Sequence, residues 1–356
     1  MSGKVEAEIS RNVLLVGPMF KPARGGIAQV LSTYDSQLFD HMNFVANSSQ
    51  GRLTNVWLLA KSLLQCLWGL LVHGYRIVHI HTASRNSYVR SRLFQNLAHL
   101  LGRKVVMHIH GGGFKQYYDG SEALRHSVAA SLRKAEAVVV LSQEWKHTFE
   151  QDLGLTNLHC IANPIARPIV LPVKADGKVH ILFMGLLIEQ KGVFDLVEAL
   201  SMIDESLRSQ MVLHVCGTGD VERLNSLIEQ YHLQESVAYE GWVDGERKNE
   251  LLSLCEIVAL PSYIEAMPLT ILEGMSHGMA VFASQVGSIP AVVNDGVNGC
   301  LFNPGEKNIM ASRLSELVGD AQLRARMGQK SAERAREFFP ETIAQRLNEL
   351  YQQLMN

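Results

Sequence analysis

The sequence predicts an α/β protein built from two doubly wound parallel-sheet domains. Short apolar runs, typical of buried strands, recur through both halves of the chain. Most of them end in glycine-rich turns followed by helical periodicity, the pattern expected of parallel βαβ units. A proline-rich segment without clear periodicity separates the two series, so we expect one domain on each side of it, with the functional residues at a cleft between them.

The composition of the 356-residue chain is that of an ordinary folded protein, long enough for two domains. Apolar residues make up 47% and charged residues 19%, which is not the composition of a disordered chain. The net charge of −2 gives no signature of nucleic-acid binding. Five scattered cysteines without a CxxC pair favour reduced thiols, a cytoplasmic location and the absence of a structural metal. The polar N-terminus does not resemble a secretory signal.

The first predicted strand, 11–17, leads into a loop that contains Gly25 and Gly26. An apolar-periodic segment follows the two glycines. The pair is compatible with phosphate binding at a helix N-terminus, and equally with a tight turn between a strand and a helix.

The next two predicted strands, 77–81 and 104–110, each end in an alternating pair of histidines. Alternation places His79 and His81 on one face of the first strand, and His108 and His110 on one face of the second. His110 precedes a run of three glycines, and active-site groups gather at the carboxyl ends of parallel strands. We therefore single out His110 as a ligand contact, with a structural histidine as the alternative. A structural role is favoured for the other three, since no cysteine or carboxylate cluster completes a zinc site.

Val56 to Val72 forms the longest apolar stretch of the chain. It is short for a membrane-spanning helix, so we expect a helix that covers a sheet. A helix that dips into the inner leaflet of a membrane is the alternative. Arg85, Arg90 and Arg92 follow it, and they suit either lipid phosphates or a solvated helix face.

After a fourth strand at 137–141, the chain reaches the proline-rich segment, and we place the first domain at 1–164 and the linker at 165–178. The second domain, 179–336, repeats the alternation with strands at 180–184, 211–216, 238–242, 257–260 and 280–283. Lys191 precedes the helix at 194–200, where its ammonium group and backbone N–H groups are suited to one phosphate. A surface lysine is the alternative. Gly217 opens a further glycine-rich turn.

The segment from Pro261 to Pro290 carries two glutamates, Glu265 and Glu273. Pro268 suits the first turn of a helix, so Glu265 is expected just before that helix and Glu273 inside it. The helix is apolar nearly all round, and a buried carboxylate is costly without a partner. Ligand hydroxyls or an arginine would satisfy Glu273, and so would an internal salt bridge.

The stretch EAMPLTILE, Glu265 to Glu273, with its glycine-rich continuation, resembles the Glu-x7-Glu motif of glycosyltransferase family 4. These are retaining enzymes with the GT-B fold, in which two Rossmann-like domains face a central cleft. The resemblance covers nearly the whole chain. Its supporting matches are Gly25, Gly26, His110 with its glycines, Asn163, Pro164, Lys191 and Gly192.

The resemblance implies a role for each candidate residue. Lys191 would neutralise the donor diphosphate, Glu273 would bind the nucleotide ribose and Glu265 would lie against the donor sugar. His110 would contact the sugar from the opposite domain. The remaining candidate donor-binding residues are Gly25, Gly26, Gly185, Gly217, Ala266, Met267, Pro268 and Leu269. Pro340 would mark the kink where the last helix, 337–356, crosses back to the first domain.

One position departs from the family pattern. The family usually has an arginine after the glycine of the loop that carries the lysine, whereas this chain has Leu186 after Gly185. A charge-assisted contact of this kind contributes about 1.5–3 kcal/mol. Either another basic group, such as Arg24, replaces it, or donor binding is weak.

The resemblance implies a metal-independent hexosyl-type transferase that uses a UDP- or GDP-sugar. Its acceptor would be a saccharide, lipid-linked, at the cytoplasmic face of the inner membrane, as in exopolysaccharide, capsule or O-antigen synthesis. The alternative is a catalytically degenerate protein of the same fold that binds a nucleotide sugar or a partner. A nicotinamide-dependent dehydrogenase is disfavoured, because its GxGxxG pattern is absent after the first strand.

Overall fold

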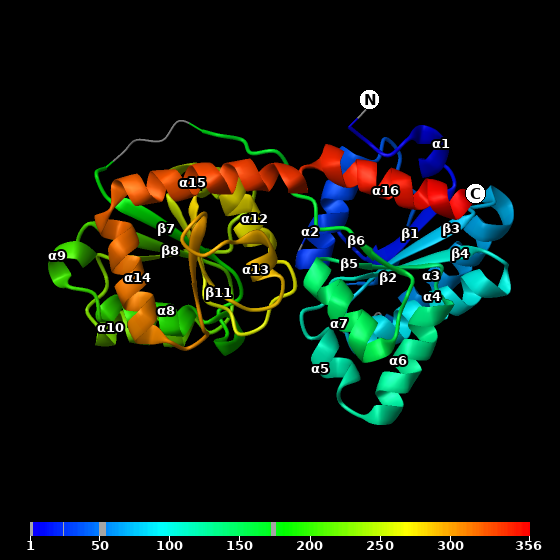
Figure 1. Ribbon diagram of the computed structural model, residues 1–356, viewed down its shortest axis with the longest axis horizontal. Helices are drawn as coiled ribbons and strands as arrows, with labels where there is room; N and C mark the ends of the chain where they lie inside the picture. Colours follow the sequence, from blue (N-terminus) through cyan, green and yellow to red (C-terminus); the bar gives the residue numbers. More distant parts are fainter. Residues whose placement is uncertain (1–2, 24, 50–54, 172–175) are drawn as a thin grey trace. The chain divides into compact units, whose positions relative to one another are not determined.

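The computed structural model describes residues 3–23, 25–49, 55–171 and 176–356, which form two compact units (Figure 1). Unit 1 comprises Met1–Ala166 and Glu337–Asn356, and unit 2 comprises Arg167–Arg336. Each contains one six-stranded sheet in which all strand pairs are parallel. The predicted α/β class with two doubly wound parallel sheets is therefore confirmed.

The sheet of unit 1 has the strand order β2-β1-β3-β4-β5-β6. Its strands are β1 (Val13–Pro18), β2 (Phe44–Ser48), β3 (Ile77–Thr82), β4 (Lys104–Ile109), β5 (Ala137–Val140) and β6 (Leu158–Cys160). Its helices are α1 (Ala7–Ser10), α2 (Gly26–Thr33), α3 (Asn55–Trp68), α4 (Asn86–Leu100), α5 (Phe114–Tyr118), α6 (Glu122–Lys134), α7 (Gln143–Leu153) and α16 (Pro340–Met355), with π-helical turns η1 (Tyr34–Leu38) and η2 (Gly69–His73). The order reverses between β1 and β3, and a ligand site is expected at the carboxyl ends of strands beside such a reversal.

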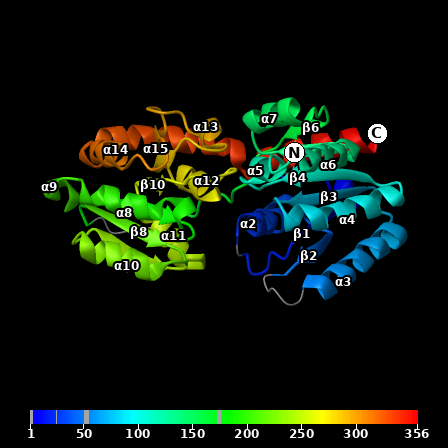
Figure 2. The ribbon, with the colours of Figure 1, turned by 90° about the horizontal axis from the view of Figure 1, so that it is seen from below.

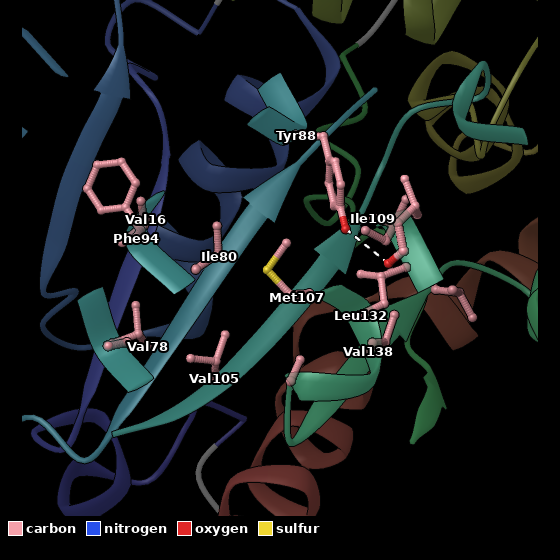
Figure 3. Close-up of a cluster of buried hydrophobic side chains, with 14 of the residues drawn as sticks. Val16, Val78, Ile80, Tyr88, Phe94, Val105, Met107, Ile109, Leu132 and Val138 are labelled. Atoms are coloured by element: carbon pink, nitrogen blue, oxygen red, sulfur yellow. Dashed lines mark hydrogen bonds between the residues drawn. The ribbon is translucent and has the colours of Figure 1, made fainter. Parts of the chain in front are cut away.

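Alternate residues of the central strands point into one apolar cluster, shown in Figure 3. Val78 and Ile80 of β3 and Met107 of β4 meet side chains from the helices on that face, including Tyr88 of α4 and Leu132 of α6. The side chains between them in sequence, among them the four histidines, therefore face the other side of the sheet. That side is covered by η1 and α16, which pack on each other.

The sheet of unit 2 has the order β12-β11-β10-β7-β8-β9. Its strands are β7 (Val179–Met184), β8 (Met211–Cys216), β9 (Val237–Gly241), β10 (Ile257–Leu260), β11 (Ala280–Ser284) and β12 (Gly299–Phe302). Its helices are η3 (Glu189–Lys191), α8 (Val193–Ser201), α9 (Glu205–Arg208), α10 (Val221–Gln230), α11 (Gly245–Leu254), α12 (Leu269–Ser276), α13 (Ile289–Val292), α14 (Lys307–Gly319) and α15 (Ala321–Ala335), and the short turn η4 (Arg336–Phe338) leads from α15 to α16. The order reverses between β7 and β10, so the loops after these two strands are where a ligand site is expected.

Two details differ from the sequence analysis. Strands β2, β6 and β12 were not predicted, because FVANS, LHC and GCLF are short and lack a strong apolar run. Pro268 is the N-cap of α12, with an extended ψ of 121°, and not a residue of its first turn. The helix begins at Leu269, so its first free backbone N–H groups lie one residue later than predicted.

Candidate functional site

The loops that follow β7 and β10 bring Lys191 and Glu265 together in unit 2. Lys191 Nζ lies 2.6 Å from Glu265 Oε1, although 74 residues separate the two in sequence. Ser262 Oγ donates to the same carboxylate oxygen at 2.8 Å. The Glu265 side chain is only 9% exposed and that of Lys191 26%. The pair lies at the point of the sheet where the strand order reverses.

Close backbone packing fixes the position of Glu265. Gly287 has φ +56°, and a Cβ there would lie 2.0 Å from the Glu265 carbonyl oxygen. The next residue, Ser288, donates its N–H to Ala266 O at 2.7 Å. On the other side, Gly192 has φ +67° and packs against the Pro261 carbonyl in the same way. Only glycine fits at 192 and 287, so these approaches position both members of the Lys191–Glu265 pair.

Glu273 forms a salt bridge with Lys248 inside unit 2. Its Oε1 lies 2.7 Å from Lys248 Nζ of α11, and both side chains are mostly buried. Helix α12 itself is tied to the end of β7, because Thr270 Oγ1 donates to Met184 O at 3.0 Å. The salt bridge, one of the two alternatives for Glu273, is therefore present, and ribose binding remains a prediction. Lys248 was missed because nothing in the polar run GERKNE distinguishes it from a surface lysine.

Gly185 and Gly217 lie in adjacent turns, after β7 and β8. Gly217 has φ +146°, and a Cβ there would lie 1.8 Å from the Gly185 carbonyl oxygen. This approach explains the glycine at 217 without a ligand, and donor contacts by both glycines remain predictions. The side chain of Leu186 is 48% exposed. Arg24, the proposed replacement for the missing arginine, lies outside the described residues.

Arg223, at the start of α10, contacts the short turn η3 that contains Lys191. Its guanidinium group pairs with Glu189 and lies over the ring of Phe194, 4.1 Å from the centroid. No local sequence pattern predicts this approach, because residues 189 and 223 come from different βα units.

The other backbone candidates follow Glu265. Ala266, Met267 and Pro268 are buried, and Leu269 is partly exposed at the first turn of α12. Pro268 has no N–H, so it offers a ligand only its carbonyl and ring. Contacts from these four residues to sugar or phosphate remain predictions.

In unit 1, Gly25 and Gly26 border a cavity of ≈ 260 Å³ at the carboxyl edge of the sheet. Gly25 is the N-cap of α2 with φ +96°, and among the described residues no side chain or backbone from outside the immediate neighbours lies within 4 Å of the position of a Cβ at either glycine. Met19 and Ser48 line the same cavity. The loop therefore has open space beside the N-terminus of a helix. This arrangement is compatible with phosphate binding and also with a tight turn between a strand and a helix.

His110 lies immediately after β4, and both of its ring nitrogens are engaged within unit 1. Nδ1 lies 3.1 Å from Asn163 Oδ1, and Nε2 lies 2.9 Å from His81 Nδ1. Burial lowers the pKa of His110 to about 4, against a smaller opposing effect of the Asn163 hydrogen bond. These bonds fit the structural alternative for His110. Contact with a sugar remains a prediction, and it would require one of these nitrogens to change partner.

The other three histidines continue this row across the sheet. His79 Nδ1 lies 2.5 Å from the Tyr351 hydroxyl of α16, and His79 Nε2 lies 3.2 Å from His108 Nδ1. Burial, with a smaller effect of His110, lowers the pKa of His79 to about 3, and burial also holds the pKa values of His81 and His108 well below normal. We call His79, His81, His108 and His110 the histidine row.

Nitrogens of His79, His81 and His108 all lie within 4.8 Å of one another, which is within reach of a metal ion. Both nitrogens of His79 already have partners in the protein, so a metal would have to displace them. The absence of a metal from the functional site remains a prediction.

The two units match two family models. Residues 172–334 match the model described as glycosyl transferases group 1, and residues 36–166 match glycosyltransferase family 4. A D-inositol 3-phosphate glycosyltransferase of Corynebacterium jeikeium is 30% identical over 48% of this chain, which spans only 43% of that relative's length. A 41.2 kDa protein in the cps region of Klebsiella pneumoniae is 29% identical over 80% of this chain and 85% of its own.

Solved structures share the fold over nearly the whole chain. A sucrose-phosphate synthase of Thermosynechococcus elongatus has a TM-score of 0.77 at 20% identity, covering 96% of this chain and 98% of its own. HepE of Anabaena, solved in complex with UDP, has a TM-score of 0.74 at 19% identity. The match covers 96% of this chain and 100% of the HepE chain. HepE has also been solved in complex with UDP-glucose.

Proposed function

Because the chain belongs to the family 4-type glycosyltransferases with the GT-B fold, we propose that it transfers a hexosyl-type sugar. The donor is a nucleoside-diphosphate sugar and the acceptor a saccharide. A uridine nucleotide is the favoured donor, since HepE binds UDP and UDP-glucose, and a GDP-sugar is the other candidate. The transfer retains the anomeric configuration and needs no metal ion.

The Lys191–Glu265 pair carries this proposal. In a transfer from a sugar nucleotide, the bond between the anomeric carbon and the diphosphate breaks, and negative charge develops on the leaving phosphate. In this proposal Lys191 leaves Glu265 and binds that phosphate, after which the Glu265 carboxylate accepts hydrogen bonds from sugar hydroxyls. The same two side chains thus stabilise each other without ligand and act separately when a donor is bound.

The remaining candidates take supporting roles in the proposal. Glu273 accepts hydrogen bonds from the ribose, in exchange for or in addition to its bond to Lys248. The free backbone N–H groups at the start of α12 stabilise negative charge on the donor phosphates. Arg223 supplies the second cation that the family obtains at position 186. In unit 1, His110, Gly25 and Gly26 remain candidates for sugar and phosphate contacts.

The proposed acceptor is a lipid-linked saccharide at the cytoplasmic face of the inner membrane. The Klebsiella relative lies in a cps region, which favours cell-surface polysaccharide assembly such as that of capsule, exopolysaccharide or O-antigen. A second candidate function, a catalytically degenerate protein that binds a nucleotide sugar or a partner, is favoured by the exposed leucine at position 186.

Turnover separates these two functions. The purified chain is incubated with a panel of UDP- and GDP-sugars and with membranes that carry lipid-linked saccharides, in the presence of EDTA. We expect release of the nucleoside diphosphate and a product whose anomeric configuration, read by NMR, is that of the donor. An inverted linkage contradicts retention, loss of turnover in EDTA contradicts metal independence, and donor binding without turnover favours the degenerate protein.

Glu273→Ala is expected to weaken UDP binding roughly tenfold or more, because a carboxylate that bonds to ribose hydroxyls contributes about 1.5–3 kcal/mol. Glu265→Ala should change UDP binding much less, since free UDP carries no sugar. Calorimetric titration with UDP measures both. Glu250→Ala, which removes an exposed glutamate of α11, is the control, and the reverse order of effects for Glu265 and Glu273 would refute the assignment.

A further inference from the structure

The outer face of α3 and η2 carries large apolar side chains that no other part of the described chain covers. They are Val56, Trp57, Leu64, Trp68, Leu71 and Val72, each more than half exposed. Helix α4, which packs beside α3 (Figure 2), adds exposed Val89, Leu93 and Leu100. We call these nine side chains the α3–α4 face. Soluble proteins rarely expose so many large apolar side chains on one pair of packed helices, so these side chains indicate an interaction surface.

The opposite side of the same helix is held on the sheet. Cys66 and Leu70 are fully buried, and Ser62 donates its hydroxyl to the carbonyl of Ala46 in β2. By length and composition Val56–His73 could cross a bilayer, the one such helix among the described residues, and 22% of it is buried. Because its inner side belongs to the core of unit 1, the helix as folded is suited to lie on a membrane.

The charge of the chain segment that contains α3 and α4 favours an anionic surface. From residue 41 to residue 118 the chain contains nine lysines and arginines and not one aspartate or glutamate. The rest of the chain therefore carries a net charge of −11, since the whole chain has −2. Lys61 is exposed within the apolar stripe of α3, and Arg92 lies on α4. Such a segment attracts anionic headgroups and would be repelled by a cationic partner.

We propose that the α3–α4 face docks unit 1 onto an anionic lipid surface. Trp57 and Trp68 enter the headgroup region, where tryptophan is favoured at the boundary of water and lipid. Lys61, exposed on α3 among these side chains, pairs with lipid phosphates. This inference deepens the proposed function, and its meaning for catalysis rests on that function's lipid-linked acceptor.

The docking face reaches the edge of unit 1 that carries the cavity beside Gly25 and Gly26. Strand β2 ends at Ser48 and α3 begins at Asn55, so Trp57 lies near the carboxyl edge of the sheet. Ser48 also lines the cavity beside Gly25 and Gly26. An acceptor whose lipid stays in the membrane would thus present its saccharide at the edge that carries this cavity.

Vesicle flotation tests the apolar part of the proposal. The full chain is mixed with vesicles of phosphatidylglycerol and phosphatidylcholine, or of phosphatidylcholine alone. We expect strong partitioning onto the anionic vesicles only, and at least a tenfold loss for Trp57→Ser/Trp68→Ser. Trp242→Ser, which removes the exposed tryptophan of unit 2, should leave partitioning unchanged. Thermal melts verify that each variant is folded.

Lys61→Glu tests the charge part and should lower binding to anionic vesicles roughly tenfold, since it reverses one cation at the surface. Equal partitioning onto both vesicle types, or equal binding by the wild type and the double tryptophan variant, overturns the proposal. So does a wild-type dimer that this variant converts to monomer without any vesicle binding, because a second copy would then cover the face.

Calorimetry with UDP keeps this test separate from the proposed function. UDP affinity is expected to be the same in the wild type and the tryptophan variant. If UDP binds and turnover occurs while vesicle binding is absent, only the docking inference fails. If vesicles bind while no sugar nucleotide is turned over, the proposed function fails and the docking surface stands.

Discussion

Replacement of Lys191 by methionine is expected to lower kcat/KM for the sugar nucleotide roughly 10²–10³-fold, the usual cost of losing one group that stabilises developing negative charge. Methionine keeps much of the length of the side chain and removes the ammonium group. The loss should fall mainly on kcat, because the charge on the leaving diphosphate is greatest in the transition state. Steady-state kinetics with the donor found in the panel measures the effect.

Two further variants make this result specific. Lys191→Met leaves the mostly buried Glu265 carboxylate without its ammonium partner, so thermal melts of Lys191→Met and Lys191→Met/Glu265→Gln measure whether this unpaired carboxylate destabilises the protein. Lys330→Met removes an exposed lysine that pairs with Glu333 on α15, and it should retain activity. If Lys191→Met has kinetics within about threefold of the wild type, Lys191 does not bind the diphosphate as proposed.

Mild acid is expected to unfold unit 1 selectively, because the histidine row is buried in the neutral form. The pKa of His79 is lowered to about 3 and that of His110 to about 4, while burial also lowers the pKa values of His81 and His108. In the unfolded chain each histidine regains a pKa of about 6.5. Below that pH the unfolded chain binds protons that the folded unit does not, so stability falls as the pH falls from about 6.5 toward 4.

The size of this effect is large compared with the stability of a domain. At about pH 5.5 each such histidine costs on the order of 1 kcal/mol, so the four together cost several kcal/mol. Folded domains are stable by only about 5–15 kcal/mol. Unfolding by guanidinium at about pH 8 and pH 5.5 measures the difference. The fluorescence of Trp145, which stacks on Phe149, reports unit 1, and it is followed in a Trp57→Ser/Trp68→Ser/Trp242→Ser variant because Trp57 and Trp68 are exposed in the folded protein.

Matched variants identify the source of the pH dependence. His108→Asn removes one member of the row and should reduce the loss of stability by about one quarter. His126→Asn removes an exposed histidine of the same unit and should leave it unchanged. Equal stability of unit 1 at both pH values would show that the four histidines are not buried in the neutral form.

Local sequence patterns determined most of the fold. Apolar runs of four to seven residues located nine of the twelve strands, because a strand buried on both faces leaves little room for polar side chains. The same patterns placed Lys191, Glu265 and His110 just after strand ends, and loops at the carboxyl ends of parallel strands are where ligands bind in such sheets. Strand β2 was missed because its five residues include Asn47 and Ser48.

The partners of the functional residues were decided only by the tertiary structure. The pairs Lys191–Glu265, Lys248–Glu273 and Arg223–Glu189 join residues 74, 25 and 34 positions apart. Their contacts depend on which strands are neighbours and on backbone approaches such as that of Gly287 to Glu265. No local pattern encodes these, since the strand order β10-β7 arises from crossovers of whole βα units.

The sequence by itself thus determined the two-sheet class, the family resemblance and the identity of the donor-site candidates. Only the fold decided that Glu273 is neutralised by Lys248, that His110 bonds to His81 and Asn163, and that the apolar stretch Val56–Val72 has one buried and one exposed side. The physical reason is the same in each case. Composition and periodicity report how a residue suits its own strand or helix, whereas charge pairing and exposure depend on elements that are distant in the chain.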